Sequence, residues 1–181
     1  MSAGDVGIQV EEARLGQYAK NTARTLQRKG TARGARLAGR LGRQLRTIRA
    51  AALKLSARSA GEAHTPQAVE WLLDNRYLVE RAAREAMLAL RGAGRFPADR
   101  RTGLPAVYTL AAGLARAGQN VVTRVRVGRY LAGAQTVWPL SEKELWLFVP
   151  LLKAALVESV AGLCGEMLRT PDADPARAAA A

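Results

Sequence analysis

Cysteine and histidine are almost absent from this sequence. Among 181 residues there is one cysteine, Cys164, and one histidine, His64. A single cysteine excludes a disulfide within the chain and a paired-cysteine zinc knuckle, and it is typical of a reducing compartment. His64 lies beside a predicted helix start and is interpreted as a surface or capping group, since the chain also lacks the paired Glu-x-x-His motifs of di-iron bundles. We therefore expect no metal, no cofactor and no catalytic residue.

Aromatic residues are also scarce, and none lies among the arginines between residues 33 and 58. Single-stranded nucleic acids are held by rings on which the bases stack, so this absence argues against that mode of binding. An uninterrupted apolar run of membrane-spanning length is missing too. The longest candidate, residues 145–163, contains Lys153, Glu158, Pro150 and Gly162, which favours a packed core helix over a membrane span. No export signal follows the polar start of the chain.

Acidic residues are few in the first third of the chain. Residues 1–60 contain 13 basic and 3 acidic side chains, whereas residues 61–181 contain 15 and 12, so most of the net charge of +13 lies in the first segment. Apolar residues recur every three or four positions there, which predicts an amphipathic helix from about residue 11 to 59, broken near Lys29–Thr31. Its apolar stripe consists of Leu37, Leu41, Leu45, Ile48, Ala52 and Leu55. We interpret residues 1–61 as a basic helical arm.

The polar surface of this arm is rich in arginine. The candidates for contact with a polyanion or a membrane are Arg33, Arg36, Arg40, Arg43, Arg46 and Arg49. One interpretation is a solvated helix face of a common kind. The other is an arm that lies on an anionic lipid surface or on the backbone of a nucleic acid.

Residues 62–169 are predicted to form an all-α domain, an irregular bundle of four to six helices. Its first helix should start with Thr65 as the cap and Pro66 at the first helical position, and should continue to about Leu90. Asn75 falls on or near the apolar stripe of this helix, so we expect it to bond to another element. The acidic residues Glu70, Asp74 and Glu80 are interpreted as structural, because no catalytic partner accompanies them.

The later helices have clear boundaries. Residues 91–103 are expected to be a loop, and a helix should run from about Leu104 to Gly118 with the Tyr108 hydroxyl in water. Residues 121–127 alternate like a strand, but no partner strand is evident, so a helix capped by Thr123 and ending near Gln135 is preferred. Ser141 and Glu144 form a capping box. The last helix should kink at Pro150 and bury the stripe Leu145, Val149, Leu152, Leu156, Val160 and Leu163. Residues 170–181 are expected to be a linker or a disordered tail.

Two blocks of this sequence form a specific combination. The first is Trp71-Leu72-Leu73-Asp74-Asn75, and the second contains Glu144-Leu145-Trp146 and Pro150, with Leu104-Pro105 and Tyr108 between them. In order and spacing, residues 65–163 resemble the N-terminal region of cyclic β-1,2-glucan synthases. The two blocks and Tyr108, ten residues in all, are interpreted as a structural signature of this helical module. The sequence departs from that family's pattern at residues 119–123, where an acidic turn is replaced, and at Gly133-Ala134, where aromatic character is lost.

The resemblance implies a segment of a large bacterial inner-membrane enzyme that uses UDP-glucose. Neither its transferase nor its phosphorylase-like domain is found in this chain, so the resemblance implies a non-catalytic scaffold or regulatory segment, either a fragment or a free-standing relative. Its partners would be the transferase and membrane domains of the synthase, and its place the cytoplasmic side of the membrane or the cytoplasm. The alternative function is that of a small basic α-helical protein that binds nucleic acid, with Arg33 to Arg58 as the contact surface.

Overall fold

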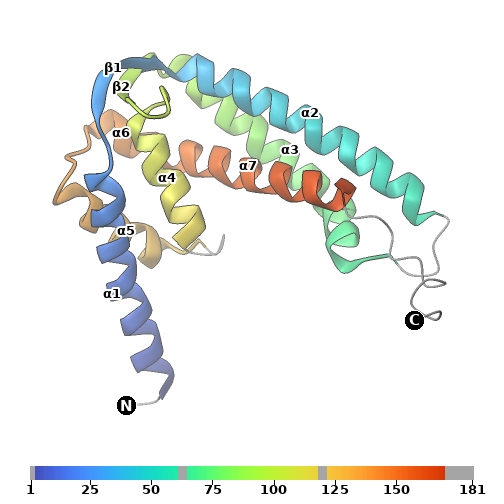
Figure 1. Ribbon diagram of the computed structural model, residues 1–181, viewed down its shortest axis with the longest axis horizontal. Coiled ribbons are helices and arrows are strands. Elements are labelled where there is room, and N and C mark those ends of the chain that lie inside the picture. The colour runs from blue at the N-terminus through green and yellow to red at the C-terminus, as the bar shows by residue number, and fades with distance from the viewer. Residues whose placement is uncertain (1–2, 61–64, 118–121, 170–181) are drawn as a thin grey trace.

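The computed structural model describes residues 3–60, 65–117 and 122–169, with side chains from Arg14 onward. The elements in these ranges are α1 (Ala3–Arg24), β1 (Arg28–Arg33), α2 (Gly34–Ser59), α3 (Gln67–Gly92), β2 (Arg95–Asp99), α4 (Ala106–Ala117), α5 (Arg124–Gln135), α6 (Glu142–Trp146) and α7 (Phe148–Arg169). The described chain is mainly helical, as predicted, and contains seven helices and a small sheet where we expected an all-α bundle of four to six helices (Figure 1).

The two short strands were not predicted from the sequence. β1 and β2 pair antiparallel, with Thr31 opposite Pro97 and Arg33 opposite Arg95. Residues 91–103, expected to be a loop, therefore include half of a sheet. The alternation that signals a strand is missing because nearly all of β1 is exposed. Gly30 and Gly94 have positive φ angles of 68° and 70°, which only glycine adopts without strain, and they let the chain turn at this corner.

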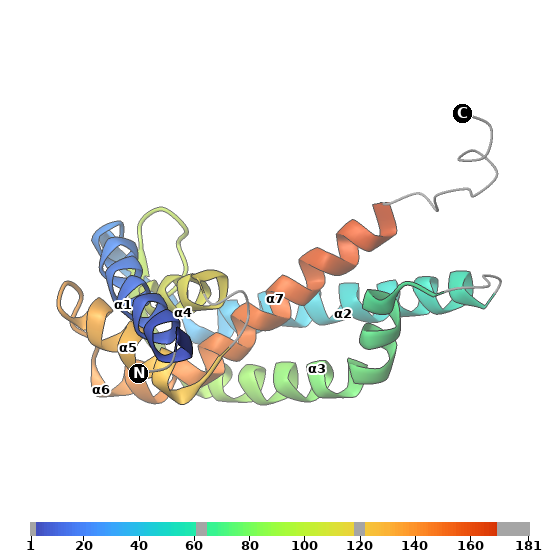
Figure 2. The same ribbon diagram turned by 90° about the horizontal axis from the view of Figure 1, so that it is seen from below.

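The three long helices α2, α3 and α7 pack against one another and form the longer part of the molecule (Figure 2). All six residues of the apolar stripe predicted for residues 37–55 are buried, so that prediction is confirmed. Gly34 permits the closest approach, because a Cβ on it would lie 2.3 Å from the carbonyl oxygen of Leu90. Helix α2, from the segment interpreted as an arm, thus shares one core with α3 and α7. The domain boundary near residue 61 stays a prediction.

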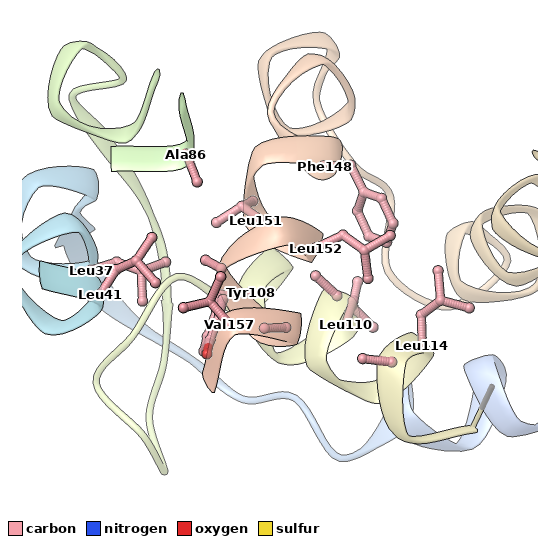
Figure 3. Close-up of a cluster of buried hydrophobic side chains, with 14 of the residues drawn as sticks. Leu37, Leu41, Ala86, Tyr108, Leu110, Leu114, Phe148, Leu151, Leu152 and Val157 are labelled. Atoms are coloured by element: carbon pink, nitrogen blue, oxygen red, sulfur yellow. The ribbon is translucent and has the colours of Figure 1, made fainter. Parts of the chain in front are cut away.

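Helices α1, α4 and α5 form a second group beside the first (Figure 1). Here too a glycine allows contact, since a Cβ on Gly133 of α5 would lie 2.4 Å from the carbonyl oxygen of Gly16 in α1. Helix α4 joins the two groups by packing on α7. Figure 3 shows Leu110 and Leu114 of α4 beside Phe148 and Leu152 of α7 in one continuous core.

The predicted helix starts have different outcomes. The Thr123 hydroxyl accepts a hydrogen bond from the backbone N–H of Arg126, so the helix that we preferred over a strand is confirmed together with its cap. The capping box of Ser141 and Glu144 is also confirmed. The cap predicted at Thr65 is wrong: α3 begins at Gln67, and Pro66, in an extended conformation, is its N-cap residue without a side-chain hydrogen bond.

Pro150 lies in the first turn of α7, after a break between α6 and α7 at Leu147. We predicted a kink inside one helix. Proline has no N–H to donate, and a first-turn position needs none, so a new helix start avoids the lost bond.

The predicted apolar stripe of the last helix was largely wrong. Of its six residues only Leu152 is buried, and the helix instead buries Phe148, Leu151, Ala155 and Val157. The reason is that α7 is covered by α2, α3 and α4 from several directions, so its buried surface is not a single stripe. Among the described residues, α7 is also the one helix whose length and composition would suit a membrane span.

Candidate functional site

An apolar groove lies between the start of α3 and the end of α7. We call it the apolar groove. It has a volume of about 430 Å³ and is lined by Gln67, Ala68, Trp71, Leu72, Val160, Leu163 and Met167. Trp71 and Leu163 remain 53% and 51% exposed. None of the lining residues carries a charge, a thiol or a hydroxyl group. The groove can therefore accommodate apolar groups but offers no group for acid–base or nucleophilic chemistry.

The helical period explains how the groove forms. Val160, Leu163 and Met167 are spaced by three and four residues and share one face of α7, and Gln67, Ala68 and Trp71 do the same at the first turn of α3. The groove lies where these two faces meet. Elsewhere between the same two helices, Lys153 Nζ of α7 lies 2.5 Å from Glu85 Oε2 of α3 in an exposed ion pair.

The ten residues that we singled out as a structural signature do not lie together in the core. Leu72, Tyr108 and Glu144 are buried, whereas Trp71, Asp74, Leu145 and Trp146 are exposed and Leu73, Asn75 and Pro150 lie between these extremes. Trp146 is 76% exposed, and its indole N–H donates to Glu142 one turn earlier. The two tryptophans therefore do not pack in the core, and their structural role stays a prediction. Periodicity alone could not identify this, because a tryptophan beside an apolar stripe can face either a core or a partner.

Asn75 does not have the partner that we expected. Its side-chain amide donates to the carbonyl oxygen of Trp71 in the same helix at 2.9 Å. The prediction that Asn75 would bond to another element is wrong within the described residues, because a local acceptor one turn away satisfies it.

The six candidate arginines separate into two kinds. Arg49 donates to Glu80 of α3 at 2.6 Å, and Arg40 pairs with Glu158 of α7. The other four, Arg33, Arg36, Arg43 and Arg46, are exposed, and no ion pair joins them to the described part of the chain. The hydrogen bond from Arg49 lowers the pKa of Glu80, which keeps this carboxylate ionised. Two arginines thus fasten α2 to its neighbours and four remain as a basic surface.

Glu158, Arg40 and Tyr108 form a polar cluster between α7, α2 and α4. Tyr108 donates its hydroxyl hydrogen to Glu158, and Arg40 contacts the other carboxylate oxygen. Burial raises the pKa of Glu158, but the hydrogen bonds from Tyr108 and Arg40 outweigh it and hold the pKa below the ordinary value. Burial and the neighbouring carboxylate raise the pKa of Tyr108, so this phenol keeps its proton. The Tyr108 hydroxyl, which we expected in water, is therefore a structural donor.

Of the two residues of rare type, the structure describes Cys164. It is fully buried, and burial raises the pKa of its thiol, which makes it a poor nucleophile. His64 lies outside the described residues, as do Gly118, residues 119–121 and the predicted tail 170–181. Within the described ranges, no group of three or more His, Cys, Asp or Glu side chains could hold a metal ion.

Comparison of the chain with family models, with curated proteins and with solved structures found no match.

Proposed function

We propose that this chain is a non-catalytic scaffold or regulatory segment of cyclic β-1,2-glucan synthesis, which packs beside the transferase at the cytoplasmic side of the membrane. The observation that carries the proposal is the uncovered apolar groove, in which Trp71 of the signature is half-exposed. Half-exposed tryptophans that border an apolar pocket are typical anchors of protein–protein interfaces.

The arrangement of the groove supports a helical partner. Two helices border it, and a third helix can bury apolar side chains between them in the way that ridges fill grooves. The transferase and membrane domains implied by the resemblance would supply such helices. The exposed Trp71 then has a reason to be apolar that the core of this module does not supply, since contact with a partner would remove its ring from water.

The test is complementation in trans. A cyclic β-1,2-glucan synthase that lacks its own N-terminal region is expressed with and without this chain, and glucan formation from UDP-glucose is measured in membranes. We expect the chain to restore synthesis and to form no glucan when purified alone. Glucan formation by the isolated chain would contradict the non-catalytic role, and failure to restore synthesis would contradict the scaffold role.

Two matched variants locate the contact. The double variant Trp71→Ala/Leu163→Ala should abolish complementation because it empties the groove. The control Tyr77→Ala/Leu88→Ala removes two apolar side chains that are more exposed and lie on another face of α3, and it should leave complementation unchanged. Equal losses in both variants would show that the groove is not the contact.

The alternative function is nucleic-acid binding, and the four exposed arginines of the basic surface favour it. Neutralised phosphates release counterions, so binding should weaken steeply with salt. A gel-shift titration with duplex DNA, repeated with Arg36→Gln/Arg43→Gln and with the control Arg81→Gln on α3, tests this function. A salt-sensitive shift lost only in the α2 variant would support it, whereas flotation with anionic vesicles and no shift would support a position at the membrane.

A further inference from the structure

A second, polar cleft opens on a different side of α7. It has a volume of about 510 Å³, and the loop after β2 joins α2, α4 and α7 in forming it. We call this cavity the polar cleft. The residues that line it are Arg40, Arg101, Thr102, Leu104, Tyr108, Thr109, Ala112, Ala115, Arg116, Ala155, Glu158 and Ser159. Volumes of this size accommodate small metabolites.

The charges of the cleft do not balance. Three guanidinium groups and one carboxylate line it, and the carboxylate, Glu158, is already bound by Arg40 and Tyr108. Arg101 and Arg116 are exposed, and neither has an ion-pair partner among the described residues. Two positive charges therefore remain at the rim of a concave surface, where opposite charge would be held most strongly.

Arg101 is mounted on a rigid turn. Asp99 is fully buried and its carboxylate accepts hydrogen bonds from the backbone N–H of Arg101 and the hydroxyl of Thr102, both at 3.3 Å. The backbone N–H of Gly103 donates to the carbonyl of Asp99 at 2.8 Å, and Gly103 has a φ of +64° that favours glycine. Because the turn is fixed by these bonds, little backbone entropy is lost when Arg101 binds an anion.

We propose that the polar cleft binds a small polyhydroxylated phosphomonoester. The charge of such a group at neutral pH is about −1.5 to −2, which matches the two uncompensated arginines better than a carboxylate does. Guanidinium groups donate two parallel hydrogen bonds to phosphate oxygens. The hydroxyls of Thr109 and Ser159 donate to Asp99 and to the carbonyl oxygen of Ala155, so toward the ligand they act as acceptors for its hydroxyl groups. Leu104 and Ala112 add an apolar wall to the cleft. This inference is independent of the apolar groove and of the synthase.

Calorimetric titration with ribose 5-phosphate, with ribose and with inorganic phosphate tests the proposal. We expect saturable binding of ribose 5-phosphate, weaker binding of inorganic phosphate and no binding of ribose. Equal affinity for inorganic phosphate, or no saturable binding up to about 10 mM, would overturn the assignment.

Variants test whether the rim arginines hold the phosphate. Arg101→Gln and Arg116→Gln should each weaken binding about tenfold, as expected for the loss of a hydrogen bond between charged groups. The control Arg43→Gln removes the same single charge from an exposed position outside the cleft and should leave binding within about twofold. Equal weakening in the control would overturn the site. Circular dichroism confirms that each variant is folded.

A lipid headgroup carries the same phosphate chemistry, and vesicles that contain phosphatidic acid distinguish this source. If the vesicles bind through Arg101 and Arg116 and ribose 5-phosphate does not displace them, the ligand is a membrane phosphate and the small-molecule assignment is overturned. Displacement by ribose 5-phosphate would support it.

Discussion

The two hollows beside α7 differ in almost every physical respect. The groove toward α3 is apolar and lined by side chains such as Trp71 and Leu163, whereas the cleft toward α2 and α4 contains three arginines and Glu158. One helix therefore borders a surface suited to a protein partner and a surface suited to an anion. The difference shows that the apolar residues of a central helix need not all belong to the core, and that a carboxylate in such a helix can organise a polar site.

The lining side chains of the two hollows also differ in the contacts that they make. Side chains in the groove contact mostly apolar neighbours and water, so each can be removed without leaving a buried polar atom alone. In the cleft, Glu158 accepts from both Arg40 and Tyr108, so the loss of Glu158 takes this partner from two groups at once. Substitutions on the two sides should therefore change stability and function in different proportions.

Leu151→Ala should lower the free energy of unfolding most, because it removes a core side chain of α7, the helix that borders both hollows. Leu151 is fully buried in α7, and truncation of a buried leucine costs about 2–5 kcal/mol through lost burial and the cavity left behind. We expect the urea midpoint to fall accordingly, and the exposed control Leu163→Ala to change the free energy of unfolding by less than about 1 kcal/mol. If both variants lose a similar free energy of unfolding, Leu163 is buried in the native protein and the groove around it is filled.

Glu158→Gln should have the next largest effect and should act on the polar side alone. It removes the charge that faces Arg40, and because Glu158 is only partly buried we expect a loss of about 1 kcal/mol in the free energy of unfolding. Tyr108→Phe, which removes the other donor to this carboxylate, should be destabilising for the same reason. No change in either variant would contradict the cluster.

The pH dependence of Glu158→Gln sharpens this result. The pKa of Glu158 is lowered in the folded protein, so its contribution is fully present above the unfolded value of about 4.3 and is lost as the pH falls through the folded value. Arg40 and Tyr108 face the carboxylate from α2 and α4, and the raised pKa of Tyr108 keeps its hydroxyl protonated in this range. The difference between wild type and variant in urea unfolding should therefore be constant near pH 7 and shrink below about pH 4.

Trp71→Ala should separate stability from function on the apolar side. The indole is half-exposed, so its truncation is expected to cost no more than about 1 kcal/mol, far below the value for a buried tryptophan. Complementation of the shortened synthase should nevertheless be impaired. A large loss of stability would instead show that Trp71 packs in the core. It would then have the structural role that the sequence suggested.

Much of the fold could be predicted from local chemistry. The stripe from Leu37 to Leu55, the Thr123 cap and the capping box of Ser141 and Glu144 depend on residues a few positions apart, and the structure confirms each of them. The strand pairing of Thr31 with Pro97 depends on residues that are distant in the sequence, and exposed strands carry no alternation to reveal them.

The candidate sites were less predictable for the same reason. The sequence identified Trp71 and the six arginines, but it could not show that α7 leaves Trp71 uncovered or that Arg40 meets Glu158. Arg101 and Arg116 were missed because they lie 15 positions apart in the sequence, and only the turn after β2 and the packing of α4 bring them to one cleft.

Asn75→Ala should have the smallest effect, and it tests whether polar groups on the two sides of α7 differ in kind. The Asn75 amide donates to a carbonyl of its own helix, which water or the helix itself can satisfy, and alanine has the higher helix propensity. These effects oppose each other, so urea unfolding should shift the free energy by no more than about 0.5 kcal/mol. A loss near that of Glu158→Gln would mean that Asn75 bridges two elements after all. A neutral result, with Glu158→Gln destabilising, would show that Glu158 links two helices and that Asn75 does not.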